Sequence, residues 1–306
     1  MDANPVILRR TRDFGETISD TIQYLKQHVR NLVLLYLVFV APFILVATLL
    51  GADSISGFFA RGASGSSLLE NPFSLISPVL ILAVLLYLCS SVAYGTAVYL
   101  FMRNTEEKGG LSSSISEVGA RFLPRFLSNA GYLCLAMIGF FGLALFGIVP
   151  ILGILIVLVA VFYFMVCLSL LYPVNTVEDR KFPDAFRRVF RLIRDRWWYT
   201  FGVVLVFGLI YYFFATIIGF VVNMIMGFSA VNFLQPAGTE MLASKKYLLT
   251  LGISSLIQQI FSIIVYVGIG VHYFSLREEK DGSGLEARIE QLGGGGGQHG
   301  HIEEQY

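Results

Sequence analysis

One stretch of the chain limits its fold more than any other: residues 126–177 contain no Asp, Glu, Lys or Arg. As a single helix rising about 1.5 Å per residue, this stretch would extend roughly 78 Å. The hydrocarbon core of a bilayer is only about 30 Å thick, so the stretch has to cross it twice. We expect the turn between Gly147 and Gly153, because Pro150 lacks a backbone donor and the glycines permit a reversal.

Six apolar stretches are long enough for a membrane-spanning helix, which needs about 20 residues. They are residues 31–50, 78–102, 131–149, 151–174, 201–226 and 247–275. Only 14% of the residues are charged, whereas a soluble domain carries about 25%. The sequence therefore predicts an all-α integral membrane protein with six transmembrane helices, and it argues against a soluble enzyme. The first stretch begins too late for a cleavable signal peptide, so we expect it to be a retained span.

The 22 Lys and Arg residues are divided unevenly between the two sides of this arrangement. Only Arg61, Lys245 and Lys246 fall on the side opposite the termini. Because basic segments remain in the cytoplasm, both termini are predicted to be cytoplasmic. The expected domains are a cytoplasmic N-terminal segment with an amphipathic helix (1–30), a six-helix transmembrane domain (31–275) and a cytoplasmic Gly-rich tail (276–306).

A short amphipathic segment precedes each outward-going span, with apolar residues at helical spacing. The three stripes are Phe14, Ile18, Ile22, Leu25 and Val29; Leu111, Ile115, Val118, Phe122 and Phe126, interrupted by Pro124; and Phe182, Phe186, Phe190, Ile193 and Trp197. We infer a unit of interfacial elbow helix plus helical hairpin, repeated three times. The alternative is that any basic segment beside a membrane looks amphipathic.

The third of these segments is the most basic. Arg187, Arg191 and Arg194 share one flank of the helix, away from the aromatic stripe. Trp197 and Trp198 follow, and Trp rings favour the headgroup level of a membrane. We predict that the three Arg side chains bind anionic lipid headgroups while the apolar stripe lies in the interface. The alternative is that these charges only set the topology.

No catalytic motif is present: the chain has no P-loop, no nucleophile elbow, no zinc-protease motif and no kinase motif. We predict that the protein is not an enzyme. Among the polar residues of the spans, we expect Asn223, Gln258 and Gln259 to make interhelical hydrogen bonds. His272 is expected to be interfacial, at the cytoplasmic end of the last span.

No cofactor or metal site is predicted. Cys89, Cys134 and Cys167 all lie in apolar runs without the spacing of metal ligands, and buried small hydrophobes are their expected role. His299 and His301 are a weak metal-binding pattern in the tail. Because no further ligand accompanies them, we expect a solvated tail.

Three short segments resemble a known family. They are residues 8–18 (Leu-Arg-Arg-Thr-Arg-Asp-Phe-Gly-Glu-Thr-Ile), 182–190 (Phe-Pro-Asp-Ala-Phe-Arg-Arg-Val-Phe) and 273–292 (Tyr-Phe-Ser-Leu-Arg-Glu-Glu-Lys-Asp-Gly-Ser-Gly-Leu-Glu-Ala-Arg-Ile-Glu-Gln-Leu). Together they resemble an uncharacterised family of bacterial six-span proteins, which is similar to the membrane domain attached to some glycerophosphoryl diester phosphodiesterases. The catalytic domain of those enzymes is absent here. The resemblance therefore implies fold and location in the bacterial cytoplasmic membrane, without hydrolysis.

Two functions are compatible with these features. The first is a non-catalytic multi-pass protein that scaffolds partners or contacts membrane lipid through its basic interfacial helices, with no role for nucleic acid. The alternative is a permease or channel subunit with a path between the repeats. A polar cavity lined by Asn223, Gln258 and Gln259 would favour the alternative, whereas a dry bundle would favour the first.

The distribution of basic residues generates a test of topology. Reporter fusions at Gly62 and Gly238 are expected to report an external location, and fusions at Gly110 and Gly282 a cytoplasmic one. A cytoplasmic signal at Gly62 would contradict the predicted orientation.

Overall fold

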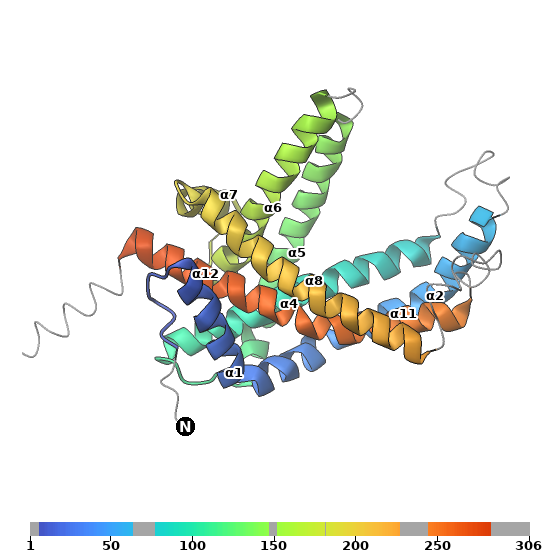
Figure 1. Cartoon of the computed structure of the whole chain (residues 1–306), viewed down its shortest axis with the longest axis horizontal. Coiled ribbons are helices and arrows are strands. Elements are labelled where there is room, and N and C mark those ends of the chain that lie inside the picture. Colours follow the sequence, from blue (N-terminus) through green and yellow to red (C-terminus); the bar gives the residue numbers. More distant parts are fainter. Residues whose placement is uncertain (1–5, 64–76, 147–151, 181, 227–243, 283–306) are drawn as a thin grey trace, which may run out of the picture.

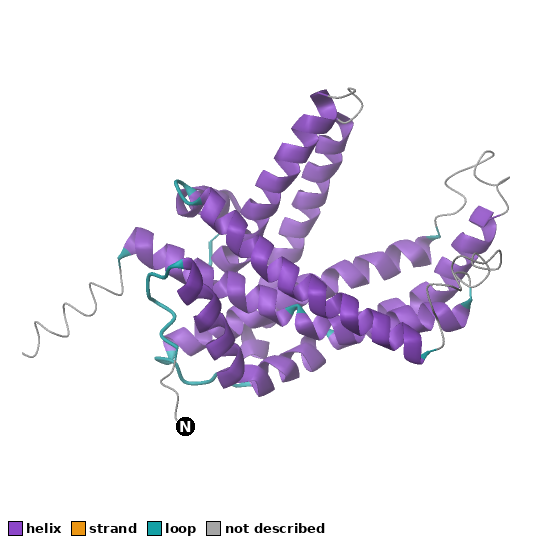
Figure 2. Ribbon diagram, viewed as in Figure 1, coloured by secondary structure: helices purple, strands orange, loops and turns teal. Residues whose placement is uncertain are grey.

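The computed structural model describes residues 6–63, 77–146, 152–180, 182–226 and 244–282. Within these ranges the chain forms helices joined by short loops and no strand (Figure 2). The helices are α1 (Phe14–Phe39), α2 (Ala41–Ala63), α4 (Pro78–Glu107), α5 (Ile115–Phe146), α6 (Leu152–Glu178), α7 (Phe182–Ile193), α8 (Trp197–Ile225), α11 (Lys245–Phe261) and α12 (Ile263–Asp281).

Among the described residues, six segments are long and apolar enough to cross a membrane. They are Phe14–Ala52, Pro78–Glu107, Ile115–Leu145, Gly153–Glu178, Trp197–Ile225 and Lys246–Asp281. The predicted all-α fold with six spans is thus confirmed. The uncharged stretch 126–177 contributes to two helices, α5 and α6, which contact each other as a hairpin (Figure 1). The central part of the expected turn, residues 147–151, lies outside the described residues.

Only one of the three amphipathic segments is a separate helix, namely α7. The first segment runs without interruption into the span within α1, and the second does the same within α5, despite Pro124. The prediction of separate elbow helices at these two places is therefore wrong. The expected domain boundaries after residues 30 and 275 likewise fall inside α1 and α12. The threefold repeat stays a prediction.

The first turns of α1 bury the face that is polar in sequence. Thr17, Thr21 and His28 are buried, whereas Ile22 and Val29 of the expected apolar stripe are exposed. The threonine hydroxyls donate to the carbonyls of Asp13 and Thr17, four residues earlier in the helix. Because these hydrogen bonds satisfy the two hydroxyls within the helix, both threonines can be buried without unpaired hydroxyl groups.

The first and last spans are each interrupted. Val40 separates α1 from α2, and the next residues contain Pro42, which has no N–H to continue the helical ladder. Ser262 separates α11 from α12, and its hydroxyl donates to the carbonyl of Gln259 over 2.7 Å. The two broken spans lie side by side, since α1 contacts α12 and α2 contacts α11.

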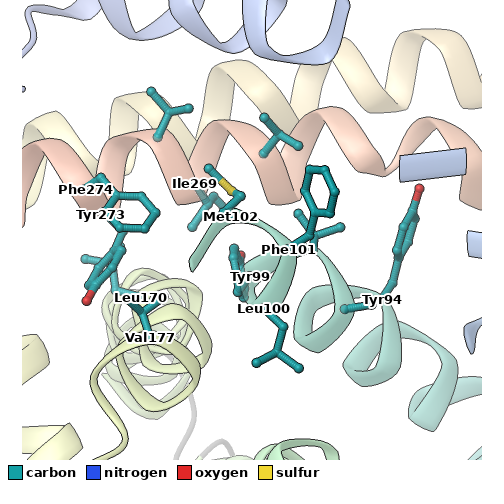
Figure 3. Close-up of a cluster of buried hydrophobic side chains, with 14 of the residues drawn as sticks. Tyr94, Tyr99, Leu100, Phe101, Met102, Leu170, Val177, Ile269, Tyr273 and Phe274 are labelled. Carbon is teal, nitrogen blue, oxygen red and sulfur yellow. The ribbon is translucent and has the colours of Figure 1, made fainter. Parts of the chain in front are cut away.

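The core of the molecule forms where α4 and α12 cross. Every residue of α4 from Val92 to Met102 is buried, as is every residue of α12 from Val267 to Leu276. Figure 3 shows aromatic and aliphatic side chains of α4, α6 and α12 gathered at this crossing. These two segments, which are far apart in the sequence, form the centre on which the other helices pack.

Two glycines allow α12 to approach its neighbours closely. A Cβ atom on Gly268 would lie 2.5 Å from the ring of Phe207 on α8, and one on Gly270 would lie 2.4 Å from the sulfur of Met102 on α4. Helices in a membrane associate mainly through such close packing, because lipid tails are as apolar as the side chains themselves.

The α5–α6 hairpin leaves this core in a different direction from α2, α4, α8 and α11 (Figure 1). Its outer half is largely exposed, with Phe141 72% and Val159 64% accessible. The two groups of helices meet near the end of the molecule where α1 begins and α12 ends, which we call the base.

The packing of α12 generates a prediction about its glycines. Gly268→Ala is expected to lower the thermal unfolding midpoint in detergent, because overpacking against a rigid ring costs about 1–3 kcal/mol. Gly270→Ala should have a smaller effect, since the flexible end of Met102 can move aside. Gly142→Ala on α5 is the control, because a Cβ atom added there would meet no neighbouring atom within 4 Å. Equal midpoints for the Gly268 and Gly142 variants would contradict this account.

Candidate functional site

The short helix α7 is held against the base by one buried arginine. The Arg188 side chain is only 3% exposed. Its Nε donates to Glu178 at the end of α6 over 3.1 Å, and both terminal nitrogens donate to Asp281 at the end of α12. Burial alone would lower the pKa of Arg188, but hydrogen bonding to Asp281 and the charge of Glu178 outweigh it, and the pKa is raised. The ion pairs therefore fix α7 to two other helices.

Of the predicted lipid-binding residues, Arg187 and Arg191 lie on α7 and Arg194 lies in the turn that follows it. Arg187, Arg191 and Arg194 are all exposed, and none forms an ion pair with another described residue. Their charge is thus available to a ligand, unlike that of Arg188. Lipid binding by these three residues stays a prediction.

Beside this basic surface, aromatic rings form a continuous ladder from α7 into the spans. Phe190 stacks on Tyr163 of α6 at 6.2 Å, and Tyr163 stacks on Trp197 at 5.9 Å. Trp197 in turn stacks on Phe201 at 5.5 Å with an angle of 5° between the rings. Trp198 is 78% exposed next to them. Large amphipathic rings of this kind are typical of the membrane–water interface.

The predicted apolar stripe of α7 is only partly its buried face. Ile193 is buried, Phe186 and Trp197 are half-buried and Phe190 is at the limit of exposure, at 36%. The side chain of Phe182 lies outside the described residues. The fully buried positions are Ala185, Arg188, Val189, Leu192 and Ile193. The helix therefore packs on the base through a neighbouring stripe that contains one arginine.

A second buried arginine organises the segment that precedes α1. The Arg12 side chain has no exposed surface and its Nε donates to Asp20 over 2.7 Å. Its guanidinium also donates to the carbonyls of Leu8 and Arg10, and its backbone N–H donates to Ser275 of α12. The N-terminal segment is in this way fastened across the base.

Sequence reasoning missed a polar network that joins α4, α5 and α6. The amide of Asn129 donates to Thr96 over 2.9 Å and to Thr176 over 3.0 Å. Asn175 donates to the side-chain oxygen of Asn129 over 2.7 Å, and Tyr132 donates to Asn175. The signal was present, because Asn129 and Asn175 lie in the uncharged stretch, but they fall just outside the expected spans. These side chains hydrogen-bond to one another, so the role of the network is to hold the three helices together.

The expected polar contacts of the last two spans are only partly visible. Asn223 donates to the carbonyl of Gly219 in its own helix over 2.7 Å. Gln258 of α11 approaches Gly219 of α8 so closely that a Cβ there would lie 2.8 Å from its side-chain nitrogen. Gln259 is buried. Whether these three residues hydrogen-bond between helices stays a prediction.

His272 is buried between helices, and its expected position at the cytoplasmic interface stays a prediction. It is 1% exposed, and its Nε2 lies 3.0 Å from the Thr200 hydroxyl of α8. The crossing of α12 over α8 buries it, although it lies only a few residues from the end of α12. In the described part of the chain, no group of His, Cys, Asp and Glu residues is arranged to hold a metal ion.

Compared with protein families, curated proteins and solved structures, the chain matches none of them. The resemblance to the membrane domain of glycerophosphoryl diester phosphodiesterases therefore stays a prediction. The functional argument depends on the chain's own residues.

The role of Arg188 can be tested by proteolysis. Arg188→Met is expected to release α7 and to increase tryptic cleavage at the neighbouring arginines, because α7 loses its ion pairs with Glu178 and Asp281. The free energy that holds α7 against the base should fall by up to about 3 kcal/mol. This is less than for a fully buried ion pair, because Asp281 is partly exposed. Arg187→Met also removes one tryptic cleavage site, but from an exposed position. It should leave α7 as resistant to trypsin as in the wild type. Unchanged resistance of the Arg188 variant would contradict the anchoring role.

Proposed function

We propose that this chain is a non-catalytic multi-pass protein of the bacterial cytoplasmic membrane, with its base in the cytoplasm, and that it contacts anionic lipid headgroups through α7. Six apolar helices support membrane insertion. The uneven distribution of Lys and Arg supports the orientation.

One observation carries the lipid assignment: the arginines of α7 are divided between two roles. Arg188 faces inward and is neutralised by Glu178 and Asp281. Arg187, Arg191 and Arg194 face outward and have no acidic partner among the described residues. A helix fixed in place by one arginine thus presents three others as a preorganised cationic surface.

The aromatic neighbours of this surface support a position at headgroup depth. The aromatic ladder of Tyr163, Trp197 and Phe201 continues from it into two spans, and exposed Trp198 lies at the same level. Arginine stems can lie along such apolar surface while the charged groups reach phosphates. Each arginine near an anionic membrane surface contributes about 1 kcal/mol, which is small against the insertion of six spans but sufficient to select among lipids.

Trp197 and Trp198 are the only tryptophans in the chain, so intrinsic fluorescence reports directly on this place. The full-length protein is reconstituted in mixed vesicles in which bromine is carried either by the anionic lipid or by the neutral lipid. Wild-type fluorescence is expected to be quenched more strongly by the brominated anionic lipid at equal bromine content. Replacement of Arg187, Arg191 and Arg194 by Gln should abolish most of this difference. Salt should weaken it in the wild type, because charges are screened within about 10 Å at 0.1 M.

A matched control removes the same charge elsewhere on the base. Lys26, Arg30 and Lys280 are also exposed, and their triple Gln variant should retain the preferential quenching. Equal quenching by the two brominated lipids in the wild type would overturn the proposal. An equal loss in both triple variants would overturn it too, because the effect would then follow net charge alone.

A permease or channel subunit is the second candidate, and one observation favours it. The first and last spans are both interrupted, at Val40 and Ser262, and lie side by side. Tyr36 links them, since its hydroxyl donates to the carbonyl of Leu256 over 2.6 Å. Interrupted helices at corresponding positions of a membrane domain often mark a transport site. Protein-dependent solute flux or ion conductance in reconstituted vesicles would support this candidate.

A further inference from the structure

A cavity of about 350 Å³ lies among α2, α4 and α11, away from the base. It is lined by Ala47, Thr48, Ala52, Ala83, Val84, Tyr87, Leu88, Leu248, Leu251, Gly252 and Ser255. Binding sites for small molecules have volumes of about 300–1,000 Å³ and mostly apolar walls. The cavity is therefore too large to be an ordinary packing defect, and its walls have the composition of a site.

Small residues keep this space open. Ala47, Ala52 and Ala83 are buried at its walls and extend no further than Cβ. Thr48 lies against Gly252, where an added Cβ would be 1.9 Å from its methyl group. This contact brings α2 and α11 together on one side of the cavity, while α4 closes another. The void results from the alanines, because larger side chains at the same positions would fill it.

The depth of the cavity follows from the helix ends. Its lining residues fall within about ten residues of the start of α4 at Pro78 and of α11 at Lys245. At about 1.5 Å per residue, they lie within roughly 15 Å of those ends. The cavity thus belongs to the half of the spans opposite the base, where hydrocarbon is the surrounding medium.

The chemistry of the walls restricts the occupant. The lining contains no charged side chain, and its polar atoms are confined to Thr48, Tyr87, Ser255 and the backbone. The Ser255 hydroxyl is already satisfied by the carbonyl of Gly252. A bound water needs two to four polar partners, so these walls favour an apolar occupant. The rim residues Val84, Tyr87 and Leu251 are 50%, 42% and 40% exposed, which opens the cavity toward the lipid-facing surface.

We propose that this cavity binds the hydrocarbon chain of a membrane lipid. An acyl chain matches the apolar walls, the depth and the sideways opening. Transfer of a chain from bilayer to cavity gains little hydrophobic energy, so the gain comes from van der Waals contact with the walls. The fit between the acyl chain and the cavity walls therefore determines how strongly the chain binds. The site is separate from the basic surface of α7, and its test is independent of the proposed headgroup contact.

The test uses the full-length protein in neutral phospholipid vesicles that contain a small fraction of phospholipid with a diazirine in the middle of one acyl chain. After irradiation, labelled residues are located by peptide mass spectrometry. Leu88 and Leu251 are expected to be labelled saturably, so that added unlabelled lipid with the same chain lowers their labelling. Lipid-facing Leu155 and Val159 on α6 should be labelled only in proportion to the probe's share of the lipid.

Ala83→Leu fills the cavity and is expected to lower labelling of Leu88 and Leu251 about tenfold, which corresponds to ~1.4 kcal/mol of lost binding free energy. The thermal unfolding midpoint should stay unchanged or rise, because filling a cavity does not overpack. Val159→Leu is the control at a lipid-facing position, and it should leave cavity labelling unchanged. If the Ala83 variant does not accumulate, Ala47→Val serves the same purpose from the opposite wall.

Three results would overturn the proposal. One is labelling at Leu88 and Leu251 that never saturates, and another is labelling that survives both filling substitutions. The third is crosslinking of Leu251 to another copy of the chain with loss of lipid labelling, because a second copy would then occupy the opening.

Discussion

The close packing of α12 against α4 and α8 is the constraint on which the rest of the structure depends. In a bilayer, apolar side chains gain little by leaving lipid for protein, so helices associate where their surfaces fit at short range. Gly268 and Gly270 supply that fit against Phe207 and Met102. Once α4 and α12 cross, α1, α6 and α8 pack around the crossing, and their ends meet at the base.

Polar interactions then fix the base and leave the opposite ends to lipid. Arg12, Arg188 and the Asn129 network fasten an N-terminal segment, an amphipathic helix and a hairpin to the same crossing. The two guanidinium groups and the Asn129 amide are hydrogen-bonded, so these buried groups determine position at a lower cost than unpaired ones would. Both surfaces with a proposed role follow from this division. The basic flank of α7 depends on a base that is held rigid by polar interactions. The cavity of α2, α4 and α11, in contrast, is formed by the packing of uncharged side chains.

The sequence predicted the spans because length and the absence of charge suffice for that. Residues 126–177 could only be two crossings, and the structure has α5 and α6 there. The face of α7 that is buried was harder to predict, because several overlapping sets of residues in this segment have helical spacing. Arg188 shares the spacing of Ala185, Val189 and Leu192, a signal that would have placed it inside. The interruption at Val40 had a sequence signal in Pro42, whereas that at Ser262 depends on a hydroxyl bond that no periodicity reveals.

The divergence of the α5–α6 hairpin from the other spans has a consequence for the surrounding lipids. Helices that leave one base in different directions cannot all follow the bilayer normal. With 32 residues, α5 is roughly 48 Å long, but its first turns carry Glu117, Arg121 and Arg125, so only the uncharged remainder is suited to the hydrocarbon core. In a bilayer, acyl chains beside the hairpin would therefore meet a wall that leans relative to the wall formed by α8.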